Sequence, residues 1–408
     1  MASVVGLARR WLKKAPVQPL HFHDANFETI PASRKLEEEI HDASTGRYYP
    51  VRIGEILSTK YQVVGKLGYG LGSTVWLAND LYGPRAVALK IFTNDGQNRQ
   101  EVGIYQHLQS IKSNHPGRRH VRDALDTFTL HDPQGEHQCL VHEPMWESAR
   151  DLLRRNASHR FTEDLLKAFV YRLLQAVDYL HSEAHLIHTD ISAGNVLLEI
   201  EDHSIITAFI KAEQDHPSPR KEVNGYTIYA SRSFELPKSI GEPVLSDFSS
   251  AVSGDVAHNE DVQPDVYRSP EVCLQIPWSY SIDIWNIGVL IWDLFEGKHM
   301  FYGRDPKEKR YMTRAHIAEM IALMGPPPLE LLKRGKRTAE FFTEDGQWRG
   351  EIPLPSATSL EESEENLDGS NKEAFLRFMR KMLQWEPGRR QTAKQLLQDP
   401  WLNGAATM

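Results

Sequence analysis

Three polar side chains near the middle of the chain have types and spacing that suit metal-assisted chemistry. Asp190 and Asn195 lie in the stretch HTDISAGNVLL, and Asp247 follows in LSDFSSA. A carboxylate such as Asp190 can accept or orient the proton of an attacking hydroxyl group. The amide oxygen of Asn195 and the carboxylate of Asp247 are hard ligands of the kind that Mg²⁺ prefers. Considered alone, Asp247 is more simply explained as a turn residue.

A glycine-rich segment near the start of the chain could hold phosphate groups. The stretch LGYGLGSTVW places Gly68, Gly70 and Gly72 between two predicted strands. Without a Cβ, these residues let the backbone turn tightly and approach phosphate oxygens. A glycine-rich hairpin that binds nothing has the same pattern, so the segment alone is weak evidence. Val75 and Ala88, which follow, are apolar residues of a type that can enclose an adenine ring.

Two charged residues extend this pattern. Lys90, in VALK, lies on the next predicted strand, where its ammonium could reach the α- and β-phosphates. Glu101, on the following helix, is its natural counter-ion, since a buried lysine without a partner would lose its charge. The alternative for Lys90 is a strand lysine with a solvated ammonium. The alternative for Glu101 is a surface i,i+4 pair with a neighbouring basic residue. In series with Asp190, Asn195 and Asp247, the order and spacing favour phosphoryl transfer, in which an enzyme mostly positions reactants and neutralises oxygen charge.

The elements that must position these residues fall into two groups. Short β-rich runs from Tyr61 onward, separated by turn signals, predict an antiparallel meander, with one amphipathic helix over 98–111 and two more strands up to residue 145. Beyond Glu147 the apolar spacing predicts a mainly helical lobe, with helices in 163–184, 281–298, 315–325 and 371–383. We therefore predict an α+β fold in two lobes. Its parts are an extension 1–54, an N-terminal lobe 55–145, a C-terminal lobe 146–402 with an insertion at about 199–243, and a tail 403–408.

Length and composition limit the class of protein. A chain of 408 residues is too long for one ordinary core and indicates two lobes. The net charge of −8 offers no basic footprint for nucleic acid. Two cysteines cannot form a disulfide framework or a zinc site alone, which fits a reducing compartment. No apolar stretch approaches the roughly 18 residues that a membrane span requires.

The N-terminal segment MASVVGLARRWLKKAPVQ is basic and contains no acidic residue. A mitochondrial presequence has this composition, but so does a disordered basic tail, which we prefer. We expect a protein of the cytoplasm, the nucleus or both, with mitochondrial targeting as the alternative.

With these motifs in this order, residues of about 55–402 resemble the eukaryotic protein-kinase family. Several details resemble its SR-protein kinases, which phosphorylate serine/arginine-rich proteins. Ser73 occupies the place of the third glycine, and Thr189 precedes the catalytic Asp where most kinases have Arg. The insertion before Asp247, the stretch EDVQPDVYRSPEV and the pattern GKHMFYG…MGPPP…FF also fit that family.

This resemblance implies a bilobal kinase fold and transfer of the ATP γ-phosphate, with Mg²⁺, to serine or threonine hydroxyls of proteins. Asp190, Lys90 and Glu101 are then the catalytic residues, and Asn195 and Asp247 the metal ligands. The implied ATP-binding residues are Leu67, Gly68, Gly70, Gly72, Ser73, Val75, Ala88, Lys90, Glu143 and Met145. His142 would be the gatekeeper, and Glu271 and Arg390 would form a buried pair that supports the scaffold.

Departures from the family pattern leave alternatives open. Ser192 replaces the lysine that steadies the γ-phosphate, Pro264 stands where most serine/threonine kinases have Thr, and Ser249 replaces the glycine after DF. Losing one positioned cation could cost roughly 10²-fold in rate, which slows a kinase without abolishing metal binding. We favour an active enzyme over a pseudokinase scaffold, and either over a small-molecule kinase. Thr189, with no Thr in 249–269, predicts constitutive activity, because a phosphothreonine there would lack its arginine receptor.

The expected partners are protein substrates, basic or serine/arginine-rich ones among them, with no direct nucleic acid, no membrane and a monomeric state. Lys298, Ala315 and Ala322 occupy positions where the family places acidic residues that bind substrate arginines. We therefore predict phosphorylation of serine without processive use of long Arg/Ser repeats.

Overall fold

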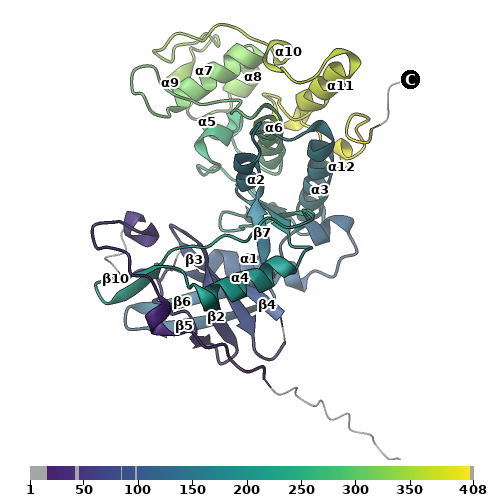
Figure 1. Ribbon diagram of the computed structural model, residues 1–408. Helices are drawn as coiled ribbons and strands as arrows, with labels where there is room; N and C mark the ends of the chain where they lie inside the picture. The colour runs from purple at the N-terminus through teal and green to yellow at the C-terminus, as the bar shows by residue number, and fades with distance from the viewer. Residues whose placement is uncertain (1–15, 42–45, 84, 97–98, 405–408) are drawn as a thin grey trace, which may run out of the picture. The chain divides into compact units, whose positions relative to one another are not determined.

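The computed structural model (Figure 1) describes residues 16–41, 46–83, 85–96 and 99–404. Most of the basic N-terminal segment, residues 1–15, lies outside this part of the chain. Among the described residues, no helix is long and apolar enough to cross a membrane. The chain divides into two units, each made of three segments. The first unit comprises Met1–Arg99, Ala124–Pro144 and Asp202–Lys238, and the second comprises Gln100–Asp123, Met145–Glu201 and Ser239–Met408.

The first unit is built on a six-stranded antiparallel sheet with the strand order β1-β2-β3-β4-β6-β5. The strands are β1 Ile56–Leu57, β2 Tyr61–Gly70, β3 Ser73–Asp80, β4 Arg85–Phe92, β5 Asp126–Asp132 and β6 Gly135–His142. Strands β2 to β6 confirm the predicted β-rich runs. Such runs form strands because β-branched and aromatic side chains pack well on a pleated surface.

One face of this sheet carries a buried apolar core. The register pairs Trp76 with Leu89 and Leu89 with Val141, so these side chains lie on the same face. All three belong to one buried cluster, and Tyr229 from the insertion joins it. The Tyr229 ring lies edge-on to Trp76 with 5.9 Å between centroids. The insertion therefore supplies part of the core of the first unit.

The insertion consists of helix α4, Ser204–Asp215, and a hairpin of β10, Arg220–Val223, and β11, Tyr226–Tyr229. Asn224 and Gly225 join the two strands with φ of 51° and 86°, the positive values that a tight two-residue hairpin turn requires. Helix α4 packs along β2 (Figure 1). A Cβ at Gly65 of β2 would lie 2.9 Å from the Phe209 side chain, so this close approach requires glycine.

The segment before the sheet is folded against the insertion. Ile30 N–H donates to the Arg220 carbonyl at 2.8 Å, and Arg220 N–H donates to Glu28 at 2.9 Å, which extends the hairpin sideways. The Nζ of Lys66, a fully buried residue of β2, lies 2.6 Å from Oε2 of Glu37 and 2.6 Å from Oε1 of Glu38. The carbonyl of Tyr229 accepts a third hydrogen bond from Lys66, at 3.1 Å. One buried ammonium thus joins β2, the extension and the insertion.

The second unit is mainly helical. A small sheet with the order β12-β9-β7 and a pair of short strands, β8 and β13, accompany the helices. The strands are β7 Met145–Ser148, β8 Leu186–Ile187, β9 Val196–Glu199, β12 Pro243–Leu245 and β13 Val252–Ser253. The longer helices are α1 Arg99–Ser110, α3 Glu163–Ser182, α6 Ser281–Glu296, α7 Thr313–Met324 and α11 Gly369–Arg380. The shorter helices are α2 Ala149–Arg155, α5 Pro270–Cys273, α8 Leu329–Leu332, α9 Thr338–Phe341, α10 Leu360–Ser363 and α12 Ala393–Leu396.

Helix α6 forms the centre of the second unit. Most of its residues are apolar, and every residue from Ile282 to Phe295 is buried, as expected of a core helix. The predicted pair of Glu271 and Arg390 lies beside it and is confirmed. Both side chains are fully buried, and two parallel hydrogen bonds of 2.6 and 2.7 Å join the guanidinium to the carboxylate.

Candidate active site

The loop between β8 and β9 is held by a buried carboxylate of helix α6. Asp283 accepts hydrogen bonds from the backbone N–H of His188 and of Thr189, each at 2.8 Å. The His181 side chain lies 2.9 Å from the same carboxylate. Thr189 adopts a positive φ of 69°, which costs energy for a non-glycine residue and is maintained by these contacts. The hydrogen bonds to Asp283 therefore fix the backbone that carries Asp190.

Asp190 and Asn195 are in direct contact. The Asn195 side-chain amide donates to the Asp190 carbonyl and to its Oδ2, both at 2.8 Å. The other carboxylate oxygen of Asp190, Oδ1, is buried and has no hydrogen-bond partner within the described chain. A buried acceptor left unpaired is costly, and the hydroxyl of a substrate would satisfy it.

The pKa of Asp190 is raised above its ordinary value because burial disfavours the charged carboxylate, and the nearby negative charge of Asp247 adds to this effect. Three influences lower the pKa of Asp190: the charge of His188, the hydrogen bond from Asn195 and the positive charge of Arg150.

Arg150 was not among the residues singled out from the sequence. It lies on α2, and its backbone N–H donates to the carbonyl of Ala193 at 3.0 Å, which keeps it beside the loop.

Asp247 lies after β12 in a backbone conformation with φ of 65°. The neighbouring Ser246 N–H donates to the Asn195 carbonyl at 2.8 Å, so the two predicted metal ligands are joined through one backbone hydrogen bond. Phe248 is fully buried, and its ring packs against His188 and Tyr105 with centroid distances of 5.0 and 5.5 Å. The structure therefore brings Asp190, Asn195 and Asp247 into one region of the second unit.

Helix α1 contributes a second group of buried polar residues to the same unit. Glu101 and Tyr105 are 1% and 2% exposed. Burial raises the pKa of Tyr105 well above its ordinary value, and the charges of Glu101 and Asp247 raise it further. Burial lowers the pKa of Arg122, while Tyr105, Glu101 and Asp247 raise it. Arg122, which no sequence motif indicated, thus faces the acidic groups of this cluster. The predicted pairing of Glu101 with a lysine of the first unit stays a prediction.

The departures from the family pattern have visible structural consequences. Thr189 is fully buried, and its hydroxyl donates to the Ser250 carbonyl at 2.9 Å, which joins the catalytic loop to the segment after Asp247. Ser192 and Pro264 line the same cavity, which has a volume of about 590 Å³. The space beside these two residues is therefore open.

In the first unit, Val75, Ala88 and Lys90 of the predicted nucleotide-binding set share the sheet face opposite the apolar core. Val75 pairs with Lys90, and Ala88 pairs with His142, whereas the alternate residues Trp76 and Leu89 lie in the core. The Nζ of Lys90 lies 5.1 Å from the centre of the Phe92 ring.

The glycine-rich stretch forms the end of β2, its turn and the start of β3. Gly68 pairs with Val75, and Gly70 pairs with Ser73, with a bulge at Leu67 between Lys66 and Gly68. A Cβ at Gly68 or Gly70 would meet no atom of the described chain within 4 Å. Packing therefore does not require glycine here, which favours a ligand as the reason for it.

The last predicted nucleotide contacts lie around residues 142–145. His142 is 2% exposed at the end of β6. The Glu143 side chain points away to an exposed ion pair with Arg85, at 3.0 Å, so only its backbone is suited to a ligand. Met145 opens β7 and pairs with Glu199 of β9. One of the points where the chain passes from the first unit to the second falls between Pro144 and Met145.

Comparison with known proteins gives this arrangement a family. The model of the protein kinase domain matches residues 61–233 and 236–402. A serine/threonine protein kinase of Aspergillus fumigatus is 44% identical over 96% of this chain and 97% of its own length. The serine/threonine-protein kinase SRPK of Physarum polycephalum is 28% identical over 90% of this chain and 91% of its own. A crystal structure of a kinase domain superposes with a TM-score of 0.68 at 21% identity, covering 87% of this chain and 99% of that one.

The fold is that of a protein kinase, with a β-rich N-terminal sheet and a helical C-terminal part. The chain belongs to the protein kinase family and is an ATP-using serine/threonine kinase, similar at a distance to the SR-protein kinases.

Proposed function

We propose that the chain is an active, magnesium-dependent kinase in which Asp190 orients the hydroxyl of a serine or threonine in a protein substrate. The observation that carries this proposal is the state of the Asp190 carboxylate. One oxygen is fixed by Asn195 at 2.8 Å, while the buried Oδ1 has no partner in the described chain. An incoming hydroxyl would donate to Oδ1 and be held there for attack on the γ-phosphate.

Asn195 and Asp247 are the proposed ligands of Mg²⁺, which would neutralise charge on the phosphate oxygens. Both supply oxygen atoms, the ligand type that this ion prefers. Among the described residues, no group of three or more His, Cys, Asp or Glu side chains could hold a metal. Two protein ligands suit an ion that takes its remaining ligands from phosphates and water.

We assign the ATP phosphates to the glycine-rich stretch and to Lys90, and the adenine to the face formed by Val75 and Ala88. Leu67, Ser73 and the backbone at Glu143 and Met145 complete this proposed set. The support is the register, which places Val75, Ala88 and Lys90 on one sheet face, and the open space at Gly68 and Gly70.

A pseudokinase that binds nucleotide without efficient transfer is the second candidate, because Ser192 removes a cation from the catalytic loop. The experiment that separates the two is transfer of labelled γ-phosphate from ATP to a panel of serine peptides, with Mg²⁺ or with a chelator. We expect Mg²⁺-dependent transfer that Asp190→Ala abolishes. Stabilisation by ATP without transfer above the Asp190→Ala background would favour the pseudokinase. Asp247→Asn and Lys90→Met should remove the Mg²⁺-dependent thermal shift in either case.

Cys139 and Cys273 are buried free thiols, which supports our proposal of a reducing compartment, the cytoplasm or nucleus. We expect the protein to act as a monomer.

A further inference from the structure

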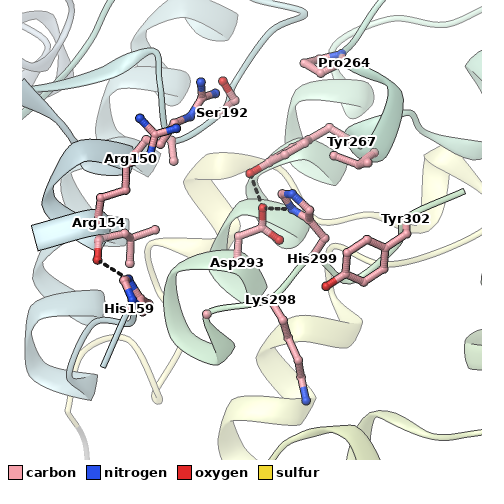
Figure 2. A pocket seen from close by; sticks show the side chains of 14 residues that line it. Arg150, Arg154, His159, Ser192, Pro264, Tyr267, Asp293, Lys298, His299 and Tyr302 are labelled. Carbon is pink, nitrogen blue, oxygen red and sulfur yellow. Dashed lines mark hydrogen bonds and ion pairs between the residues drawn. The ribbon is translucent and has the colours of Figure 1, made fainter. Parts of the chain in front are cut away.

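A cavity of about 590 Å³ in the second unit begins at the catalytic loop and is lined by basic side chains (Figure 2). Ser192 and Ala193, two and three residues after Asp190, form part of its wall. The charged and ionisable residues that line it include Arg150, Arg154, His159, Lys298 and His299. We call this cavity, with these five residues, the basic pocket.

The basic side chains come from two places in the fold. Arg150 and Arg154 lie four residues apart on α2, so they lie on the same side of that helix. Lys298 and His299 follow the end of α6 at Gly297. Figure 2 shows Arg150 and Arg154 on the same side of the pocket as Ser192, with Lys298 and His299 on the other side. A group that enters the pocket would therefore meet positive charge from two directions.

Much of this charge is available to a ligand. Arg150 is exposed and forms no ion pair within the described chain. Its guanidinium reaches the catalytic loop, because a Cβ at Gly194 would lie 2.8 Å from its Nη2. The carboxylate that pairs with Arg154 is that of Asp151. Its Oδ1 lies 3.6 Å from Nη1 of Arg154, which is beyond hydrogen-bond length. Exposed pairs of this kind contribute little, so a ligand can compete for the cation.

Lys298 also has an exposed partner, Glu365, at 2.8 Å. Because both side chains are solvated, this pair is similarly open to exchange with a ligand.

The one acidic residue of the lining is already occupied. Asp293 is 8% exposed, and its Oδ2 accepts from the Tyr267 hydroxyl and pairs with Nδ1 of His299, each at 2.7 Å. Its Oδ1 is buried without a hydrogen-bond partner in the described chain. The hydrogen bond to Asp293 raises the pKa of His299, which favours its charged form. Tyr267 and His299 therefore already occupy Oδ2 of this carboxylate, and Arg150, Arg154 and Lys298 remain as the charges that a ligand can meet.

We propose that the basic pocket binds an anionic side chain of the protein substrate, a carboxylate or a phosphoserine, near the hydroxyl that is phosphorylated. The kinase would then prefer acidic or previously phosphorylated sequences. This proposal rests on the proposed function, because it places the acceptor hydroxyl at Asp190. Extended peptides advance by about 3.3 Å per residue, so the anionic residue lies within a few positions of the acceptor. A planar guanidinium binds carboxylate or phosphate with paired hydrogen bonds, and Arg150 is placed to do so.

The test compares matched serine peptides that differ at one flanking position, which holds Gln, Glu, phosphoserine or Arg, with that position moved along both sides of the acceptor. For the full-length kinase we expect kcat/KM to rise about tenfold or more for Glu or phosphoserine over Gln at one position, the factor for one charge-assisted hydrogen bond. Arg should be the poorest substrate at that position. A preference for phosphoserine alone, or for Glu alone, identifies the source of the anion and supports the proposal.

Three variants connect the preference to the pocket. Arg150→Gln, Arg154→Gln and Lys298→Gln should each reduce the ratio of anionic to neutral peptide, and the double reversal Arg150→Glu with Lys298→Glu should invert it towards Arg. Lys394→Gln, which removes an exposed lysine of α12 outside the pocket, should leave the ratio unchanged. The altered residues are exposed, and thermal unfolding verifies that each variant is folded.

The outcomes separate this proposal from the proposed function. Transfer to neutral peptides with no preference for an anion, or with a preference for Arg, would overturn the pocket proposal and leave the kinase assignment standing. A preference that survives all three variants would also overturn it. If no peptide is phosphorylated, fluorescence anisotropy with labelled phosphorylated and unphosphorylated peptides tests the pocket directly. Equal affinities, or a difference insensitive to Arg150→Gln, would then refute it.

Discussion

Replacing Lys66 by methionine should destabilise the first unit in a way that depends on pH. Lys66→Met keeps the length of the side chain but removes the ammonium between Glu37 and Glu38, both 2.6 Å away. Glu38 is 6% exposed and would be left as a buried carboxylate without its cation. Burial already raises the pKa of Glu38, and the charge of Lys66 is the largest opposing influence. The variant therefore raises the pKa of Glu38 further.

The magnitude follows from proton uptake by that carboxylate. The ordinary pKa of this carboxyl group is 4.5, which is about 2.5 units below pH 7. Protonating it at pH 7 therefore costs about 3.4 kcal/mol of free energy, at about 1.36 kcal/mol per unit. At pH 5 the same step requires about 0.5 units, or about 0.7 kcal/mol. The folded pKa lies above the unfolded one, so the folded variant binds more protons. Its stability is therefore greatest below the unfolded pKa and falls as the pH rises.

Hydrogen exchange measured by mass spectrometry reports the loss of stability in each segment of the chain separately. Amides of β2 and β11 should exchange about 300-fold faster than in the wild type at pH 7, and about threefold faster at pH 5, after correction for intrinsic rates. Amides of α6, in the second unit, are the internal control. The double variant Lys66→Met with Glu38→Gln should recover most of the lost protection, because it removes the carboxylate as well.

Equal protection in Lys66→Met and the wild type would refute this reasoning, because it would mean that the extension and insertion are not held by this ammonium. A loss of the same size at both pH values would show that lost packing, and not the charge of Glu38, is the cause.

Three further outcomes are expected. Glu271→Ala leaves the buried guanidinium of Arg390 without its partner and should lower the free energy of unfolding by about 3–5 kcal/mol in urea denaturation, whereas a loss below 1 kcal/mol would contradict the buried pair. Because Asp293 raises the pKa of His299, the stabilisation from this pair is fully present below the ordinary pKa of 6.5 and is lost as the pH rises through the raised value. The stability difference between wild type and His299→Gln should therefore shrink from pH 6 to pH 9, and a constant difference would count against the pairing. Kinase co-expressed with a phosphatase should keep its full rate, since the Thr189 hydroxyl already joins the catalytic loop to Ser250; a large loss restored by phosphorylation within 249–269 would contradict this.

Local patterns in the sequence predicted the elements that hold the site. The alternation in β2 to β6 and the apolar run of α6 are visible within short windows, because one buried face or a wholly buried helix determines them. The pair of Glu271 and Arg390 was also predicted, since a kinase-like motif surrounds each residue. Asp190 and Asn195 were expected in one loop, but the hydrogen bonds between them were not predicted.

Contacts between distant segments could not be predicted in this way. Helix α4 was missed because it lies in an insertion interrupted by proline and glycine, although Ile205, Ile206 and Phe209 give it an apolar face. Lys66 contacts the carbonyl of Tyr229, 163 residues away, and no periodicity indicates such a pair.

Arg150 was overlooked for the same reason. It lies on a short helix outside every motif, and only the fold brings it to the catalytic loop.

The most direct test of the central claim is a single-turnover measurement of γ-phosphate transfer from ATP to a serine peptide in the presence of Mg²⁺. The wild type is compared with Asp190→Asn, which keeps the size of the side chain but cannot act as a carboxylate. We predict that both proteins bind ATP equally and that the wild type transfers phosphate at least about 10²-fold faster, the lower range for a positioned acid–base group. Equal transfer rates, or no transfer by the wild type despite bound ATP, would contradict the assignment of Asp190 and with it the active-kinase proposal.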